Sequence, residues 1–333
     1  MPLATHRRFF IDAAIALAAF ASSAAFAQGA AAPPGAYPTK PVTMVVPFPP
    51  GGPTDLIARV LAQTLGEQLG QPVLVDNRGG AGGNLGGDLA AKTPADGYTL
   101  LMSSGGMVSV NPHIYSKMSF DPAKDLMPVA AAARVLVFLE TRNDLPPKTV
   151  REFMAYLKAN PGKLSYGSPG NGSSPHLAGE LFKDMGGLYA VHVPYRGAAP
   201  ALQDLLGGQI DFMFDPGIGL NQVRAGKLKL LAVGSLKRSP LFPDVPTLDE
   251  IGLKGFDADT LFGVYAPAGT PAEIVTRLNR EINRIVATPA FKERMDAIAG
   301  VPAPMSPAEF GAHAAADGVR FGTLIKARGI RGD

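Results

Sequence analysis

The chain has no cysteine, no tryptophan and little charge for its 333 residues. Without cysteine it has no disulfide, no thiolate metal site and no thiol nucleophile. The net charge is only +3 and no run of Lys and Arg is longer than two, so nucleic acid is not an expected partner. Because 46% of the residues are hydrophobic, the chain is predicted to be globular, and its length fits two domains of ordinary size.

Sequence motifs of common enzymes and metal sites are also missing. The chain contains neither the G-x-S-x-G turn of serine hydrolases nor the H-E-x-x-H pair of zinc proteases. His113, His192 and His313 lie far apart, without the spacing of metal ligands. The glycine-dense run at 79–87 lacks the G-x-G-x-x-G spacing of dinucleotide sites. We therefore expect no catalytic residue, no metal ion and no cofactor.

The N-terminal segment has the three parts of a secretory signal peptide. Arg7 and Arg8 precede an apolar stretch, which ends in the A-x-A sequence at 25–27. The stretch is too short and too rich in alanine for a membrane anchor. We predict a signal peptide at 1–27, a linker at 28–37 and a periplasmic mature protein. Export by the general or by the twin-arginine route stays open.

The clearest binding signal is a strand, loop and helix at 42–69. The β-branched run that opens this stretch stops at Pro47, and the following glycine pair lets neither strand nor helix continue. From Pro53 onward, apolar residues recur every three or four positions, which predicts an amphipathic helix. The unpaired N–H groups at a helix start carry partial positive charge. This loop is therefore expected to bind an anion.

A second loop of this kind lies at 164–181. A short strand enters a run of glycines, serines and one asparagine, and Ser174 is predicted to cap the next helix, with Pro175 at its first position. The alternation of strand, loop and helix continues through the chain, which favours a doubly wound α/β architecture. Three further helix starts have the sequence of a capping box, at Thr149, Thr270 and Ser306.

Three charged residues follow strands or lie beside the first loop, and their roles stay open. Arg196 is placed to pair either with a ligand carboxylate or with Asp204. Asp215 ends the next strand, where it either accepts a hydrogen bond from a ligand or closes a turn. Asp55 either caps its own helix, holds a bridging water, or accepts from a ligand amine or hydroxyl.

Seven fragments in a constant order carry a family resemblance. They are PFPPGGPTD at 47–55, LGQPVLVDNRGGAGGN at 69–84, PADGYTLL at 94–101, PGKLSYGSPGNGSSPHL at 161–177, VPYRG at 193–197, DVPTLDEIG at 244–252 and YAPAGTP at 265–271. On these fragments the chain resembles the Bug family, the extracytoplasmic solute receptors of tripartite tricarboxylate transporters. One departure is Phe262, where the family often has tryptophan.

The resemblance implies an α/β protein with the two-lobed type II fold of periplasmic binding proteins, each lobe a doubly wound sheet. Lobe one would comprise 38–137 and 260–333, and lobe two 138–259. Two crossing strands, near 134–141 and 256–264, would join the lobes as a hinge. Closure about this hinge would capture the ligand.

The resemblance also implies the ligand and the partners. A monomeric receptor would hold a small mono- or dicarboxylate, or an acidic amino acid, and deliver it to the membrane permease subunits of the transporter. The expected ligand-binding residues, from the loops above and from the resemblance, are Phe48, Gly52, Thr54, Asp55, Ser103, Ser168, Gly170, Asn171, Ser173, Ser174, His176, Arg196, Gly197 and Asp215.

Two other functions remain as alternatives. A sensor that feeds a two-component kinase would bind the same ligand, and the sequence does not separate it from a transport receptor. A secreted hydrolase is the less favoured alternative. It would need a dyad of Ser173 and His176 together with Asp215, and nothing in their spacing requires that arrangement.

Overall fold

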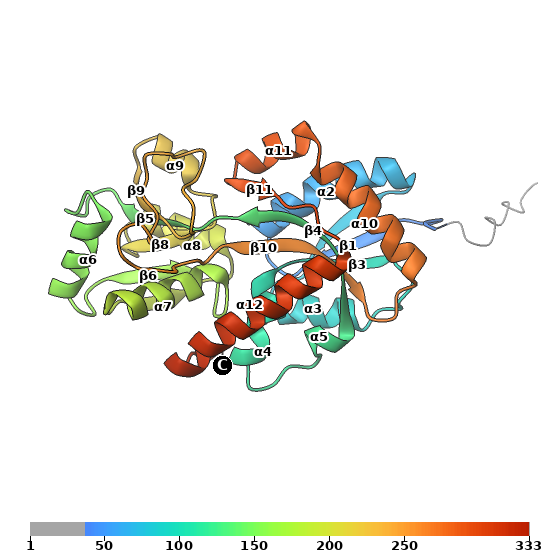
Figure 1. Cartoon of the computed structure of the whole chain (residues 1–333), viewed down its shortest axis with the longest axis horizontal. Helices are drawn as coiled ribbons and strands as arrows, with labels where there is room; N and C mark the ends of the chain where they lie inside the picture. The colour runs from blue at the N-terminus through green and yellow to red at the C-terminus, as the bar shows by residue number, and fades with distance from the viewer. Residues whose placement is uncertain (1–36, 333) are drawn as a thin grey trace, which may run out of the picture. The chain divides into compact units, whose positions relative to one another are not determined.

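The chain folds into two mixed β-sheets with helices packed around them (Figure 1). The computed structural model describes residues 37–332, so the predicted signal peptide lies outside the described residues. The first sheet has the strand order β11-β4-β10-β3-β1-β2. Its strands are β1 (Val42–Val46), β2 (Val73–Asn77), β3 (Thr99–Ser104), β4 (Leu126–Val135), β10 (Thr260–Pro267) and β11 (Gly300–Pro302).

The second sheet has the strand order β7-β6-β8-β5-β9. In it, β6 pairs in parallel with β7 and β8, whereas β5 pairs antiparallel with β8 and β9. The first sheet mixes directions in the same way, because β1 is parallel to β2 and β3 while β10 is antiparallel to its neighbours. The strands of the second sheet are β5 (Phe138–Arg142), β6 (Ser165–Ser168), β7 (Val191–Pro194), β8 (Phe212–Asp215) and β9 (Leu228–Val233).

Helices connect the strands of both sheets (Figure 1). In the described residues, no helix combines the length and the apolar character needed to cross a membrane. The helices are α2 (Pro53–Leu69), α3 (Asn84–Ala91), α4 (Asn111–Ile114), α5 (Pro122–Asp125), α6 (Val150–Ala159), α7 (Ser174–Gly186), α8 (Ala198–Leu206), α9 (Leu220–Arg224), α10 (Ala272–Val286), α11 (Pro289–Asp296) and α12 (Pro307–Arg328), with short 3-10 and π turns at η2 (Ala81–Gly83) and η3 (Gly106–Val110).

Each sheet has its own core. In β1 the successive residues Met44, Val45 and Val46 are all fully buried, so both faces of this strand are covered, as expected for a parallel strand between helix layers. In the second sheet, Phe153 of α6 packs edge-on against Phe212 of β8, with ring centroids 5.2 Å apart. The predicted fold class, an α/β fold with two separate sheets, is confirmed, and both sheets mix parallel and antiparallel strands.

The chain crosses between the sheets at two places that lie side by side. β4 ends at Val135 and β5 begins at Phe138, so a two-residue link makes the first crossing. After β9, residues 234–259 lead back to β10, whose first residue Thr260 pairs with Val135. The chain therefore leaves the first sheet on β4 and returns to it on β10, and these two strands are antiparallel neighbours.

The helix starts follow the capping predictions with two corrections. The capping boxes at Thr149 and Ser306 are formed. The prediction for Thr270 is wrong, because its hydroxyl donates to the carbonyl of Pro267 at 2.8 Å and α10 has no side-chain cap. The N-cap of α7 is Ser173 and not Ser174, since the Ser173 hydroxyl accepts from the N–H of His176 at 3.4 Å.

Gly263 is expected to be indispensable for packing α12 on β10. A Cβ at this position would lie 2.3 Å from Cζ of Phe310 and 2.6 Å from the carbonyl oxygen of Ala130. Because neither neighbour is the free end of a flexible side chain, Gly263→Ala is expected to lower the free energy of unfolding by about 1–3 kcal/mol. Urea denaturation measures the loss. Gly318→Ala, where the nearest atom is 3.5 Å away, serves as the control and should be neutral or slightly stabilising. Equal stability of both variants would contradict the packing argument.

Candidate functional site

Three helices begin at one open cavity. α2, α7 and α8 contribute their N-caps and first residues to its lining, at 52–54, 173–175 and 197–198. The first N–H groups of a helix have no acceptor within that helix, and each helix start carries roughly half a positive charge. Three such starts supply roughly 1.5 positive charges. The cavity therefore favours an anion.

The local sequence explains why each of these loops has its shape. α2 follows Gly52 and has proline at its first position, where the missing N–H costs nothing and the fixed φ suits a helix. α7 is capped by Ser173. α8 follows Gly197, which has a φ of +131° and a ψ of 168°. Residues other than glycine rarely adopt this backbone conformation.

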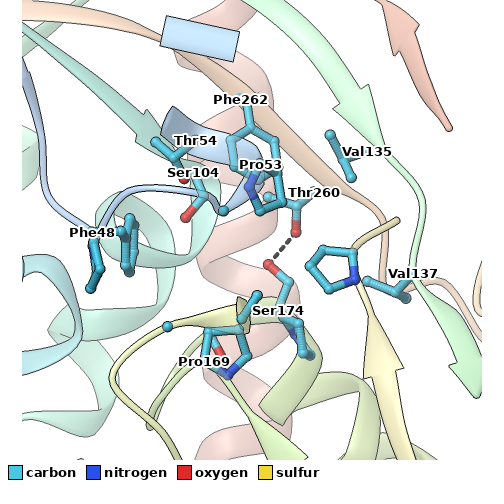
Figure 2. A pocket seen from close by; sticks show the side chains of 17 residues that line it. Phe48, Pro53, Thr54, Ser104, Val135, Val137, Pro169, Ser174, Thr260 and Phe262 are labelled. Carbon is cyan, nitrogen blue, oxygen red and sulfur yellow. Dashed lines mark hydrogen bonds between the residues drawn. The ribbon is translucent and has the colours of Figure 1, made fainter. Parts of the chain in front are cut away.

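Hydroxyl groups surround the helix starts. In the part of the chain that the structure describes, the hydroxyls of Thr54 and Ser104 line the cavity without a hydrogen-bond partner. The Ser173 hydroxyl already donates to the carbonyl of Gly170 at 2.7 Å. The hydroxyls of Ser174 and Thr260 bond to each other across the cavity (Figure 2). In the bond between Ser174 and Thr260 it is Thr260 that donates, so the hydroxyls of Thr54, Ser104 and Ser174 are left to donate to a ligand.

The Ser174–Thr260 bond also joins elements of the two sheets, because Ser174 begins α7 and Thr260 begins β10. The other residues of the lining are mainly apolar, and no described lining residue has a charged side chain. They are Phe48, Pro49, Pro53, Val135, Val137, Pro169, Pro175, Ala198, Pro216 and Phe262.

Asp55 is held by its own chain and does not line the cavity. Its carboxylate accepts from the N–H of Gly51, the Nδ2 of Asn77 and the guanidinium of Arg59, each at 3.0 Å. Burial alone would raise the pKa of Asp55, but these hydrogen bonds outweigh it and hold the pKa below its usual value. The contact with Gly51 anchors the loop before α2, a role that was not among those the sequence left open.

Asp215 lies beneath the loop that brings Pro216 to the cavity. Its carboxylate accepts from the N–H of Gly219 at 2.9 Å and is fully buried. The neighbouring strand β5 carries Glu140, which is also fully buried. Burial raises the pKa of Asp215 to about 7, and burial together with Asp215 raises the pKa of Glu140 well above its usual value. Burial therefore favours the protonated form of each acid.

Ser173 and His176 do not form the side-chain dyad that the hydrolase alternative needs. The Nδ1 of His176 accepts from the N–H of Gly172 at 3.0 Å, and its contact with Ser173 is through the backbone. The ring stacks on His192, with centroids 4.1 Å apart. Burial lowers the pKa of His176 to about 4 and that of His192 to about 3, so both rings are neutral at pH 7.

A second open cavity adjoins the first and shares Phe48, Pro49 and Pro169 with it. Its opposite rim is the glycine-rich turn at 79–83. Arg196 lines this cavity with an exposed side chain, which makes no hydrogen bond or ion pair within the described residues. Asp204, the alternative partner, instead accepts from the hydroxyl of Tyr195 at 2.7 Å.

The structure thus brings many of the predicted site residues together and places others elsewhere. Phe48, Gly52, Thr54, Ser173, Ser174 and Gly197 line the first cavity, and Phe48, Gly170 and Arg196 line the second. The side chains of Ser103, Ser168 and Asn171 bond within the protein instead, to the Ser104 carbonyl, to His192 and to the Gly332 carbonyl. Asp55, Ser103, Ser168, Asn171, His176 and Asp215 line neither cavity.

Sequence reasoning missed the residues that the crossings bring to the cavity. Val135 ends β4 and Val137 lies in the link to β5, while Thr260 and Phe262 lie at the start of β10. No loop motif marks them. The departure from the family pattern at Phe262 was the one signal in the sequence that pointed to this wall.

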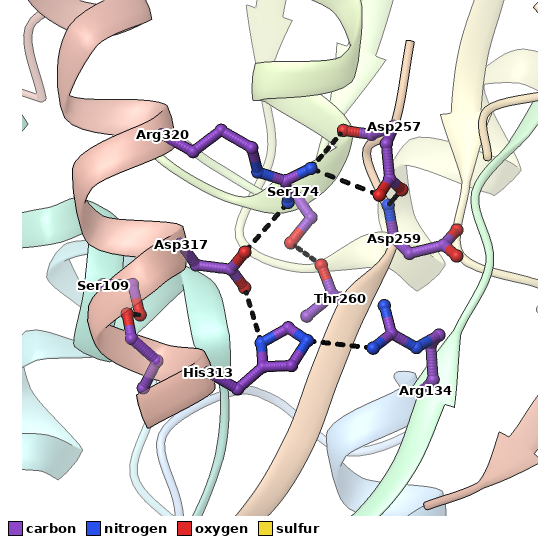
Figure 3. Close-up of polar contacts among 10 residues, drawn as sticks. Ser109, Arg134, Ser174, Asp257, Asp259, Thr260, His313, Asp317 and Arg320 are labelled. Atoms are coloured by element: carbon purple, nitrogen blue, oxygen red, sulfur yellow. Dashed lines mark hydrogen bonds and ion pairs between the residues drawn. The ribbon is translucent and has the colours of Figure 1, made fainter. Parts of the chain in front are cut away.

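A network of charged groups ties α12 to the second crossing (Figure 3). Arg320 contacts Asp317 on its own helix at 3.0 Å and the carboxylate of Asp257 at 3.3 Å. On the same helix, His313 bonds to Arg134 of β4 at 2.9 Å. The network thus holds the segment that leads directly into Thr260. The network also includes Asp259. Burial and the charge of Asp257 raise the pKa of Asp259 to about 8, although Arg134 and Arg320 act to lower it.

Comparisons with known proteins agree with this architecture. The family model described as tripartite tricarboxylate transporter family receptor matches residues 57–330. Protein BugT of Bordetella pertussis is 40% identical over 308 residues, which cover 91% of this chain and 94% of that protein. A solved structure of an R. palustris protein with adipate is 38% identical, with a TM-score of 0.86 and coverage of 89% of this chain and 99% of that chain. MatC from Rhodopseudomonas palustris with bound malate is 32% identical, with a TM-score of 0.82 and coverage of 87% and 100%.

The protein has two mixed sheets joined by adjacent crossings, and helix starts surround a cavity. These features define the class of two-lobed periplasmic binding proteins. Within that class, the chain belongs to the tripartite tricarboxylate transporter receptor family. The resemblance to Bug proteins in the sequence is therefore confirmed.

Proposed function

We propose that this protein is an extracytoplasmic receptor that captures a small carboxylate and delivers it to the permease subunits of a tripartite tricarboxylate transporter. The observation that carries the proposal is the meeting of three helix starts at one cavity that no charged side chain of the described residues lines. Such a site binds an anion through N–H groups and hydroxyls. Relatives have been solved with adipate and with malate, which are both carboxylates.

The proposal includes a change of shape on binding. Lobe one (38–137 and 260–333) and lobe two (138–259) would close about the two crossings, so that the permease recognises the closed form. The Ser174–Thr260 bond supports this idea, because it is a contact between the lobes at the cavity itself. The absence of a Ser173–His176 side-chain bond supports a receptor over a hydrolase.

Calorimetric titration of residues 28–333, freed of co-purified ligand, tests the proposal. At least one of hexanoate, adipate and malate is expected to bind with micromolar or tighter affinity. Hexanamide, which has the shape of hexanoate without its charge, is the control and should give no measurable binding, because the helix starts act on charge. Binding of hexanamide as tight as that of hexanoate, or no binding by any carboxylate, would contradict an anion receptor.

Co-purification of the permease subunits with the loaded receptor tests delivery, and capture of a membrane kinase instead would favour the sensor.

A further inference from the structure

Hydrogen bonds hold the two crossings together on the side of the second sheet. After β9, Gly234 donates its N–H to the carbonyl of Val137 in the first crossing, at 2.8 Å. The carbonyl of Gly234 accepts from the N–H of Ala258 in the second crossing, at 2.9 Å. Val137 and Ala258 also belong to the hydrophobic core of the second sheet. The returning chain is therefore fixed to the second sheet as far as Ala258.

The ladder of the first sheet begins two residues later. Thr260, the first residue of β10, pairs with Val135, the last residue of β4. One residue of each crossing, Leu136 and Asp259, therefore lies between the two fixed points. Because hinges concentrate changes of backbone conformation in a few residues, a rotation of one sheet against the other would act on this pair. We call Leu136 and Asp259 the hinge residues.

Arg320 of α12 reaches across the hinge residues (Figure 3). Its guanidinium donates to the backbone carbonyl of Asp257 at 3.1 Å and lies 3.3 Å from the carboxylate of the same residue. That carboxylate also accepts from the N–H of Asp259 at 3.2 Å. α12 packs on the first sheet, where the ring of Phe310 lies 4.8 Å from that of Tyr265 on β10, whereas Asp257 precedes the part of the chain fixed to the second sheet. We call the contact between Arg320 and Asp257 the hinge tether.

The guanidinium of Arg320 is held in place by its own helix. Asp317, one turn earlier, pairs with it at 3.0 Å and is itself buried. The side chains of Arg320 and Asp257 are partly exposed, so water screens part of their attraction. A pair of this kind changes an equilibrium by about two- to fivefold, which is enough to shift the balance between two hinge angles.

The hinge angle decides whether the binding groups meet. α2 connects strands of the first sheet, and α7 and α8 connect strands of the second, yet all three begin at one cavity. Thr260, which directly follows the hinge residue Asp259, donates to Ser174 of α7 across this cavity. A different hinge angle would separate α2 from α7 and α8. The apparent affinity for a ligand is proportional to the fraction of molecules in the arrangement that binds it.

We propose that Arg320 is a positioning residue for ligand binding, because the hinge tether holds the two sheets at the angle at which the three helix starts share the cavity. Arg320 does not line the cavity, so it raises affinity by populating the binding arrangement and not by touching the ligand. The inference rests on the proposed function for its effect on affinity, whereas the hinge tether itself is measurable without a ligand.

A distance between the two sheets tests the hinge tether in the ligand-free protein. Because the chain has no cysteine, the exposed positions Gln63 on α2 and Ala155 on α6 can be changed to cysteine and spin-labelled without interference. Pulsed electron paramagnetic resonance gives the distribution of distances between the labels. Arg320→Ala is expected to broaden this distribution or shift it, since the hinge then samples other angles. Arg320→Lys keeps the charge and should restore the parent distribution.

Arg284→Ala is the matched control for the distance measurement. Arg284 pairs with Glu281 three residues earlier on α10, at 3.1 Å, as Arg320 pairs with Asp317 on α12, but it makes no contact across the hinge residues. The variant should keep the parent distribution. An unchanged distribution in Arg320→Ala, or the same change in Arg284→Ala, overturns the hinge tether.

Calorimetry tests the consequence for binding, with the tightest ligand among adipate, hexanoate and malate. Arg320→Ala is expected to weaken binding about two- to fivefold, while Arg320→Lys and Arg284→Ala should bind like the wild type. Asp257→Asn removes the opposite charge but keeps an oxygen for the N–H of Asp259. It should weaken binding in the same way, and it replaces Arg320→Ala if that variant does not fold, as judged by its melting temperature.

The outcomes separate the hinge tether from the proposed function. Wild-type affinity in a folded Arg320→Ala or Asp257→Asn variant overturns the positioning role while the proposed function stands. If none of the three carboxylates binds the wild type, the proposed function is overturned and the role of Arg320 in binding falls with it. A changed distance distribution in Arg320→Ala would still establish the hinge tether in that case.

Discussion

The substitution Ala198→Pro is expected to weaken the binding of hexanoate and adipate about ten- to hundredfold without unfolding the protein. Ala198 is the first residue of α8 and lines the cavity. Proline removes its N–H group, which is one of the donors that we propose for the carboxylate. A hydrogen bond to a charged group contributes about 1.5–3 kcal/mol, and 1.4 kcal/mol corresponds to a factor of ten in affinity.

The fold should tolerate this change because the first position of a helix suits proline. Gly197 precedes it with a ψ of 168°, an extended conformation that proline accepts in the residue before it. We expect the free energy of unfolding to change by less than about 1 kcal/mol. Calorimetry measures the affinity, and urea denaturation measures the stability.

The control makes the same change at the same helix position away from the cavity. Ala272 is the first residue of α10 and does not line either cavity. Ala272→Pro should therefore bind hexanoate like the wild type. Wild-type affinity of a folded Ala198→Pro variant would show that the start of α8 does not bind the carboxylate.

The second large effect concerns stability and pH. Glu140 and Asp215 lie on adjacent strands and are both fully buried. In the described residues, both oxygens of Glu140 and the Oδ1 of Asp215 lack a hydrogen-bond partner. Burial therefore favours their neutral forms. Asp215→Asn is expected to stabilise the protein at pH 7.5 by on the order of a few kcal/mol, while leaving its stability near pH 4 almost unchanged.

The sign follows from the direction of the pKa shift. Burial raises the pKa of Asp215 from 3.8 to about 7, so the folded state retains a proton that the unfolded state releases. The stabilising contribution of this group is complete below the unfolded pKa and is lost as the pH rises to the folded pKa. For the wild type we therefore expect this pair to lower the free energy of unfolding between about pH 4 and pH 7.

Urea denaturation at pH 4.5 and at pH 7.5 checks the expectation, and Glu140→Gln should act in the same direction. Asp211→Asn is the contrasting control. Asp211 pairs with Arg142 at 3.0 Å and accepts from the N–H of Ser165 at 2.8 Å, so its neutralisation should destabilise the protein at pH 7.5. If Asp215→Asn and Glu140→Gln both destabilise the protein at pH 7.5 as well, the two buried acids are stabilising and the argument is wrong.

The sequence by itself determined the loops and their character. Prolines, glycines and caps act on the residues next to them, so the start of α2 could be predicted without knowledge of the fold. The ordered fragments identified the family, and six of the expected ligand-binding residues line the first cavity together. The predicted N-cap of α7 was one residue off because Ser173 and Ser174 are adjacent and both suit that position.

The sequence alone did not predict which groups surround each carboxylate inside the fold. Asp55 and Asp215 were among the expected ligand-binding residues, although the sequence also allowed each of them a structural role. The structure instead surrounds Asp55 with Arg59 and Asn77 and places Asp215 against Glu140. Asn77 and Glu140 reach these positions through strand pairing across long sequence separations. Whether a carboxylate is free depends on such distant partners, which no local pattern reveals.

Only the tertiary structure decided what lies opposite the helix starts. All five strands of the second sheet lie between Val135 and Phe262 in sequence, yet the antiparallel register of β4 and β10 brings the two residues to one cavity. The order of strands likewise decided that α2, α7 and α8 begin at the same cavity. Local sequence specifies where a helix begins and which donors it exposes, because those depend on a few adjacent residues. Which helix starts and which side chains share a cavity depends on sheet order and register, which long-range packing sets.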